Sequence, residues 1–134
     1  MQPTRTLTSL IAAATFMVAA PSFAGDVYVI VNNATVLTSD EVKDVFLGDK
    51  QVIGGAKAVP VDNASVQKDF FDKVIKVDGA KYASIWTKKA FRDGLNAPAV
   101  KSSDAEVVNL VKATPGAVGY VSSAPAGVKV VQKY

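Results

Sequence analysis

The segment from Asp62 to Lys68, DNASVQK, holds the side chains best suited to bind a ligand. A β-branched run ends before it and an apolar helical pattern follows it, so we expect it to join a strand to a helix. The first amides of a helix lack partners and carry about half a positive charge, which favours an anion. Ser65 would add a hydroxyl and Lys68 a full positive charge. The pattern therefore indicates an anion site at Asn63, Ser65 and Lys68.

The same residues also allow a purely structural interpretation. Asn63 or Ser65 would then simply cap the helix, because every helix start needs partners for its first amides. Lys68 would be an ordinary solvated side chain on the helix surface. The sequence leaves these two interpretations open.

Residues that carry out catalysis are missing or have simpler explanations. The chain contains no histidine and no cysteine, which excludes an imidazole base, a thiol nucleophile and a His/Cys metal site. Asp40 and Glu41 suit a helix start, and Asp69 and Asp72 suit an exposed helix face. A Ser–Lys pair is formally possible but has no flanking motif, and no calcium loop is present. We therefore expect a protein that is not an enzyme and that uses no metal or cofactor.

The first 24 residues have the pattern of a secretory signal. Arg5 precedes an unbroken apolar run, LIAAATFMVAA, and residues 22–24 place small side chains at a cleavage site. The run is too short to span a hydrocarbon core about 30 Å thick, and no later segment is long and apolar enough. We expect cleavage after Ala24, release into the periplasm, and a mature domain of residues 25–134 that does not span the membrane.

The mature domain is expected to carry a small positive charge. The whole chain has 15 basic and 12 acidic residues, and Arg5 is the only charged residue before Gly25, so the net charge becomes +2. Basic and acidic side chains alternate, as at Lys43-Asp44 and Lys68-Asp69. Such mixing is typical of a solvated surface rather than of a nucleic-acid interface. We expect no nucleic-acid partner, whereas attraction of small anions is compatible with this charge.

The hydrophobic patterns predict one small α/β domain. The expected strands cover residues 26–32, 57–61, 117–121 and 128–131, and the expected helices cover 38–46, 64–76, 80–92 and a segment capped by Ser103. Residues 93–101 are expected to form a loop, and Pro60 to place its strand at a sheet edge or to end it. This order predicts a small mixed β-sheet of about four strands flanked on both faces by about four helices.

Aromatic residues at helical spacing are expected to pack in the core rather than to bind a ligand. They alternate with aliphatic residues along the predicted helices. The residues concerned are Phe46, Phe70, Phe71, Tyr82, Trp86 and Phe91.

Five stretches, taken in order and spacing, resemble the phosphate-binding proteins of ABC importers, within the type 2 periplasmic binding-protein class. They are Leu37–Gly48 (LTSDEVKDVFLG), Ser65–Phe71 (SVQKDFF), the segment around Trp86 (IWTKKAF), Ser103–Val111 and Thr114–Val121 (TPGAVGYV). The first and the last stretch are the most specific. The resemblance covers most of residues 27–131.

The resemblance implies a periplasmic module related to phosphate capture. In that family two lobes close over the anion, and one lobe presents a strand-to-helix turn with a serine and often an arginine one helical turn later. Ser65 stands at the serine position and Lys68 at the arginine position, while Asn63-Ala64 replaces the glycine-rich part of the turn. The 110 residues of the mature chain supply one lobe only.

Two functions follow from this resemblance. The first is a single-lobe module that binds phosphate or a similar anion weakly, or with the help of a homodimer or a separate partner. The alternative is an interaction protein that kept the fold, lost the ligand and docks onto an envelope sensor, transporter or outer-membrane protein. An exposed basic pocket around Ser65 would favour the first function, and an exposed apolar patch would favour the second.

Overall fold

The computed structural model describes residues 25–134, and the expected export signal lies outside these residues. In chain order the elements are β1 (Tyr28–Val31), the 3-10 turn η1 (Ser39–Glu41), α1 (Val42–Phe46), β2 (Val52–Ile53), β3 (Ala56–Lys57), β4 (Val59–Asn63), α2 (Gln67–Phe70), the π-helical turn η2 (Phe71–Ile75), α3 (Gly79–Asp93), β5 (Ala99–Lys101), α4 (Asp104–Ala113), β6 (Ala117–Val121) and β7 (Lys129–Lys133). No helix in this described part of the chain is long and apolar enough to cross a membrane.

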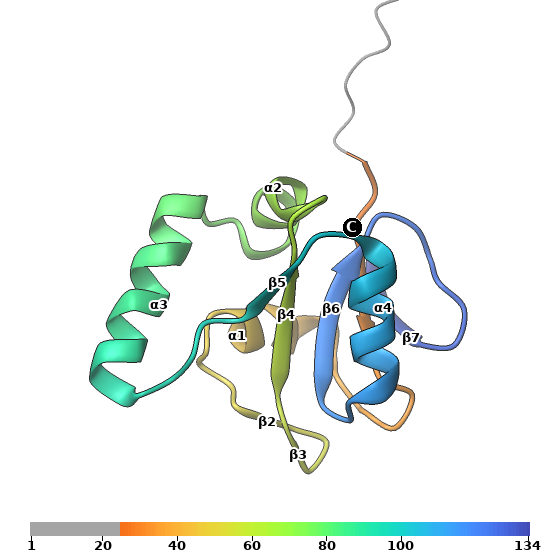
Figure 1. The fold of residues 1–134 in the computed structure, drawn as a ribbon, viewed down its shortest axis with the longest axis horizontal. Coiled ribbons are helices and arrows are strands. Elements are labelled where there is room, and N and C mark those ends of the chain that lie inside the picture. The colour runs from red at the N-terminus through yellow and green to blue at the C-terminus, as the bar shows by residue number, and fades with distance from the viewer. Residues whose placement is uncertain (1–24) are drawn as a thin grey trace, which may run out of the picture.

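The main sheet is mixed and has five strands in the order β5-β4-β6-β1-β7. β4 runs parallel to β5 and β6, and β1 runs antiparallel to β6 and β7. α4 covers one face, whereas α1 and α2 lie on the other (Figure 1). The main-chain amides and carbonyls of Val27 and Tyr134 pair at 3.1 and 2.8 Å, which holds the two ends of the described chain together. The predicted mixed sheet with helices on both faces is confirmed.

The sequence prediction was wrong about two strands. Residues 99–101 form β5 instead of belonging to a loop, because they pair in parallel with Val61–Asn63 of β4. β4 lies inside the sheet although it contains Pro60. β5 begins opposite Val61, so no strand pairs with Pro60 on that side, and its missing amide proton leaves no gap in a ladder.

Alternation along the strands divides the core between the two faces of the sheet. Val29 and Val31 of β1 point toward a cluster beneath α1 and α2, whereas Ile30 between them joins a second cluster beneath α4. In the first cluster the rings of Phe70 and Tyr120 stack with their centroids 3.8 Å apart. Aromatic packing therefore fastens α2 to the centre of the sheet.

Five of the six aromatic residues expected in the core are buried, but Phe91 is not. Its side chain is 95% exposed, whereas Tyr82 and Trp86 on the same helix are buried. A helix turns once in 3.6 residues, so a residue five positions after Trp86 points well away from the buried face. The core prediction was therefore wrong for Phe91.

Gly119 of β6 provides a test of how closely α4 packs on the sheet. A Cβ atom at this position would stand 2.5 Å from Val107 Cγ1 and 3.4 Å from Val111 Cγ2. We expect Gly119→Ala to lower the free energy of unfolding by about 1–3 kcal/mol because α4 would have to move outward. Chemical denaturation followed by circular dichroism measures the change.

A matched control is Gly79→Ala at the start of α3. Its Cβ would meet no atom closer than Phe71 Cε2 at 3.6 Å, so stability should stay the same or rise slightly. If Gly119→Ala were as stable as the wild type, the close packing of α4 on β6 would be contradicted.

Candidate anion-binding site

The parallel strands β4, β5 and β6 end at the same edge of the sheet, where polar loops follow them (Figure 1). Ligands of open α/β sheets commonly bind at this carboxyl edge. The loops include residues 64–66, 102–103 and 122–123, and five of these residues are serines. Ala64 N donates to Lys101 O at 2.9 Å, which ties the first loop to β5. The edge therefore gathers hydroxyl and amide donors from three segments that are distant in sequence.

Asn63 is the last residue of β4 and its side chain is fully buried. Its Nδ2 donates to Asp104 Oδ1 at 2.7 Å and to Tyr120 O at 3.0 Å. Its Oδ1 accepts from Ser65 N at 3.1 Å and from Ser65 Oγ at 2.6 Å. Asn63 therefore holds the 63–65 turn and links β4 to β6 and α4.

Asp104, the first residue of α4, was not predicted as a site residue but lies at the centre of these donors. Its Oδ1 accepts from Asn63 Nδ2 and lies 3.4 Å from Ser65 Oγ, and its Oδ2 accepts from Ser122 N at 3.1 Å and from Ser122 Oγ. Partial burial by itself would raise the pKa of Asp104. The hydrogen bonds from Ser122 and Asn63 outweigh that effect and hold the pKa below its ordinary value.

Ser65 and Lys68 lie differently from the capping arrangement that the sequence allowed. α2 begins at Gln67 rather than at Ala64, and its N-cap is Val66, which has no capping side chain. Neither Asn63 nor Ser65 therefore caps this helix. Lys68 is exposed on α2 and forms no ion pair with any residue between 25 and 134.

At this edge neutral donors hold the carboxylate of Asp104. An amide NH2, a backbone N–H and hydroxyls surround one carboxylate, which is how proteins hold carboxylate or phosphate oxygens. Residues 25–134 contain no cluster of three or more acidic side chains that could hold a metal ion. The sequence signalled Asn63 and Ser65 as polar residues after a strand. It gave no signal for Asp104 or Ser122, because only the fold brings them to the same place.

A second acid, Asp62, lies next to Asn63 but faces the other side of the sheet. It is 1% exposed, and it accepts hydrogen bonds from Tyr82 Oη at 2.8 Å and from Tyr120 Oη at 2.9 Å. Burial raises the pKa of Asp62 to about 6, although both tyrosine bonds act to lower it. Since Tyr82 belongs to α3, this carboxylate connects α3 to β4 and β6.

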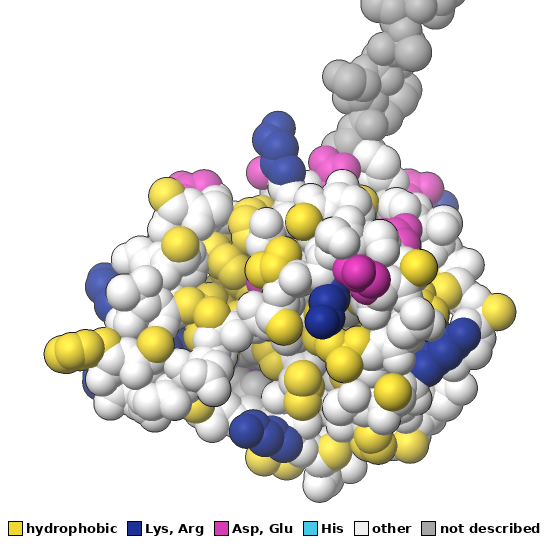
Figure 2. Space-filling view, in the orientation of Figure 1, with side chains coloured by type: hydrophobic (Ala, Val, Ile, Leu, Met, Phe, Trp, Pro, Cys, Tyr) yellow, Lys and Arg dark blue, Asp and Glu magenta, His cyan; other side chains and the backbone are white. Residues whose placement is uncertain are grey.

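α3 stands away from the sheet and leaves an apolar groove beside it. The helix is held by Tyr82 Oη on Asp62, by Trp86 Nε1 on Phe46 O at 3.0 Å and by Lys89 Nζ on Asp49 at 2.6 Å. Hydrophobic side chains are visible in the hollow between α3 and the sheet (Figure 2).

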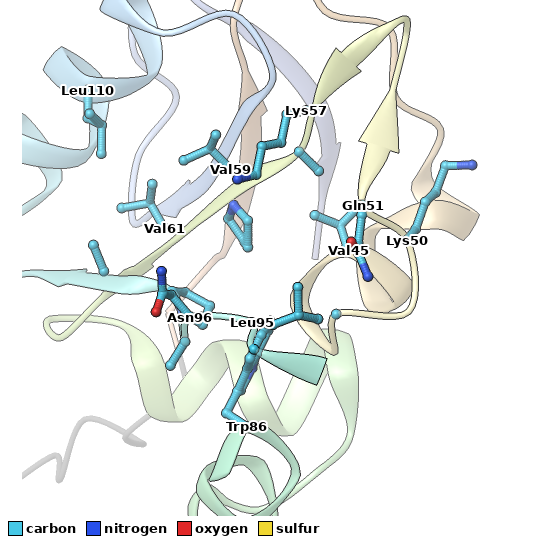
Figure 3. Close-up of a pocket in the computed structure, with 17 residues that line it drawn as sticks. Val45, Lys50, Gln51, Lys57, Val59, Val61, Trp86, Leu95, Asn96 and Leu110 are labelled. Carbon is cyan, nitrogen blue, oxygen red and sulfur yellow. The ribbon is translucent and has the colours of Figure 1, made fainter. Parts of the chain in front are cut away.

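The groove contains two cavities that share Trp86. One, of about 300 Å³, has Trp86 and Leu95 facing Val59 and Val61 across it (Figure 3). The other, of about 390 Å³, includes Asp62 and the exposed Val100 in its lining. This groove is separate from the donors around Asp104, and its apolar lining suits a hydrophobic group more than a free anion.

Searches against family models and against curated proteins found no match for this chain. Solved structures do match it. A protein from Clostridium perfringens, described as a phosphate ABC transporter substrate-binding protein with bound phosphate, matches 81% of this chain with a TM-score of 0.60 and 15% sequence identity. An ABC-type phosphate transport receptor from Vibrio cholerae matches 81% of this chain with a TM-score of 0.51 and 16% identity.

These matches confirm the fold predicted from the sequence, a lobe like those of phosphate ABC transporter substrate-binding proteins. The match covers 46% of the Clostridium protein and 47% of the Vibrio protein, so this chain spans about half the length of either. At such low identity the similarity concerns the fold alone.

Asp62 should make stability depend on pH. A carboxyl with its pKa raised from 3.8 to about 6 binds its proton more tightly in the folded protein than in the unfolded chain. Its stabilising contribution is complete below the unfolded pKa and is lost as the pH rises through about 6. Between pH 5 and 7.5 we expect the free energy of unfolding of the wild type to fall by about 1 kcal/mol relative to Asp62→Asn.

Urea denaturation of both proteins at several pH values measures this difference. Glu41 affects both proteins equally and in a lower range. The Lys50 and Thr38 side chains hold its pKa at about 2, so its contribution is lost only as the pH falls below about 4.5. Parallel pH profiles for the two proteins above pH 5 would show that Asp62 titrates normally.

Proposed function

We propose that this chain is a non-enzymatic binding module of the phosphate-binding-protein type that recognises phosphate or a similar oxyanion. The observation that carries the proposal is the convergence of Asn63 Nδ2, Ser65 Oγ and the Ser122 amide and hydroxyl on one oxyanion-sized position, where the Asp104 carboxylate lies. The fold shared with phosphate ABC transporter substrate-binding proteins supports it. Lys68, exposed on the helix that follows, would add a positive charge near this edge.

The proposed recognition is weak in an isolated lobe. Each neutral hydrogen bond contributes about 0.5–1.5 kcal/mol net, and a bond to a charged group about 1.5–3 kcal/mol. Millimolar affinity already requires about 4 kcal/mol, and a site open to water on one side loses further energy to solvent and salt. Tight binding would therefore need a second binding surface that covers the open side of the site, supplied by a second copy of the chain or by another protein.

We also propose that the protein acts in the periplasm after removal of residues 1–24. The charged start, apolar run and small residues before Gly25 are typical of an export signal. A transporter-type anion module would meet its ligand in that compartment.

A second candidate function is docking onto an envelope protein without a small ligand. The apolar groove beside α3 favours it, together with Phe91 at 95% and Val100 at 57% exposure near the same helix. Contiguous exposed apolar surface often marks a protein interface. The two functions predict different responses to phosphate.

A phosphate titration followed by NMR tests the proposed function. In wild-type protein we expect millimolar binding, with shifts concentrated at residues 62–68 and at Ser122, and weaker binding at high salt. Ser65→Ala and Lys68→Ala should each weaken binding severalfold, because each removes a donor or a charge.

Matched controls are Ser84→Ala and Lys88→Ala, which remove the same groups from exposed positions on α3. These two variants should bind phosphate like the wild type. Absence of any shift in wild-type protein at tens of millimolar phosphate would reject anion binding by the isolated module and leave the docking function.

A further inference from the structure

The carboxylate of Asp104 is held in the way that a bound anion would be held. Asn63 Nδ2 donates to one of its oxygens at 2.7 Å, and Ser122 N donates to the other at 3.1 Å, together with the Ser122 hydroxyl. Ser65 Oγ lies 3.4 Å from the first oxygen. Both carboxylate oxygens are therefore bound, by groups from β4, the turn after it and the loop after β6.

The carboxylate of Asp104 does not cap its own helix, α4. Ser103 caps α4, since its side chain accepts from Glu106 N, and the Glu106 carboxylate accepts from Ser102 N and Oγ at 2.9 and 2.8 Å. The hydrogen bonds of the Asp104 carboxylate described in residues 25–134 all come from outside α4. An acid in a first helical turn is common, but one whose oxygens are bound by two distant strand ends has a further role.

The remaining donors at this edge are also occupied. Asn63 has both amide hydrogens and its oxygen in hydrogen bonds, and the Ser65 hydroxyl lies 2.6 Å from Asn63 Oδ1. Within the described chain no buried side-chain nitrogen or oxygen lacks a partner. An incoming anion would reach the donors of Asn63 and Ser122 only if one of these bonds broke, and the partly exposed Asp104 is the group that can leave toward solvent.

We infer that Asp104 determines the affinity and specificity of the oxyanion site by occupying it: its carboxylate is the resident anion, and a ligand enters only by displacing it. This inference rests on the proposed function and deepens it. A doubly charged phosphate beside an ionised Asp104 would be repelled, and the donors would be shared between two anions. Removal of the carboxylate leaves Asn63 Nδ2 and the amide and hydroxyl of Ser122 free for an external oxyanion.

The test compares inorganic phosphate binding by the wild type, Asp104→Ala and Glu106→Ala, measured by NMR at low salt. Glu106→Ala is the matched control, because it removes the same charge from the same helical turn but leaves the Asn63 and Ser122 donors occupied. We expect Asp104→Ala to bind phosphate about tenfold more tightly than the wild type or better, with the Ser122 amide shifting most. Glu106→Ala should stay within about twofold of the wild type.

A second measurement does not depend on the stability of a variant. In wild-type protein the carboxyl carbon of Asp104 should change its NMR shift during the phosphate titration in step with the Ser122 amide, because phosphate replaces the Asp104 carboxylate.

A third measurement uses thermal unfolding. Asp104→Ala should unfold at a lower temperature than the wild type and regain stability with phosphate.

The outcomes separate the inference from the proposed function. Tight binding by Asp104→Ala and none by the wild type supports the inference, while rejecting phosphate binding by the native module alone. Wild-type binding that is not improved in Asp104→Ala, or that improves equally in Glu106→Ala, overturns the inference and leaves the proposed function in place. Absence of binding in all three proteins, with an unmoved Asp104 carboxyl signal, overturns both.

Discussion

Asp62 and Asn63 lie buried next to each other at the end of β4, so their hydrogen-bond partners must come from inside the protein. The positions of several other elements depend on these hydrogen bonds. Asp62 and Asn63 are consecutive in a strand, so they face opposite sides of the sheet. Asp62 receives hydroxyls from α3 and β6, and Asn63 binds β6, the turn that follows it and α4. An unpaired polar group at either position would cost several times more than a typical hydrogen bond contributes. These two residues therefore tie α3 and α4 to the centre of the sheet.

The same constraint explains why the candidate site and the scaffold share residues. Asn63 positions Ser65 through two hydrogen bonds and binds Asp104 through a third. A residue that orients the donors of a site in this way is also part of the fold, so its side chain is pre-organised and loses little entropy when an anion is held. Because the donors are neutral, their number and direction, rather than a large positive charge, decide what this edge of the sheet can hold. That agrees with a domain whose basic and acidic residues are nearly balanced.

α3 lies beside the main sheet rather than on one of its faces (Figure 1). Three polar side chains of α3 bind the rest of the described domain. Tyr82 and Trp86, the buried aromatic residues of this helix, each donate a hydrogen bond, and Lys89 forms an ion pair with Asp49 near the surface. The apolar groove lies between this helix and the sheet, and Trp86 lines both of its cavities. The domain thus combines a polar edge, where the Asp104 carboxylate occupies the donors, with an apolar groove that is open to solvent. The two surfaces share β4 and α4, but the groove lining does not include Asn63, Ser65, Asp104 or Ser122.

The sequence alone determined the class of the fold and the location of the polar edge. Alternating β-branched residues and helical apolar patterns are local signals, and a strand followed by small polar residues marks a carboxyl edge wherever the sheet lies. Hence residues 28–31, 79–93 and 117–121 were predicted closely, and so was the placement of the polar residues Asn63 and Ser65 where β4 ends. Only the tertiary structure decided that residues 99–101 form β5 and that Asp104 meets Asn63 and Ser122. Each of these depends on a contact between segments far apart in the chain, such as the 41 residues between Asn63 and Asp104, and no local pattern encodes such a distance.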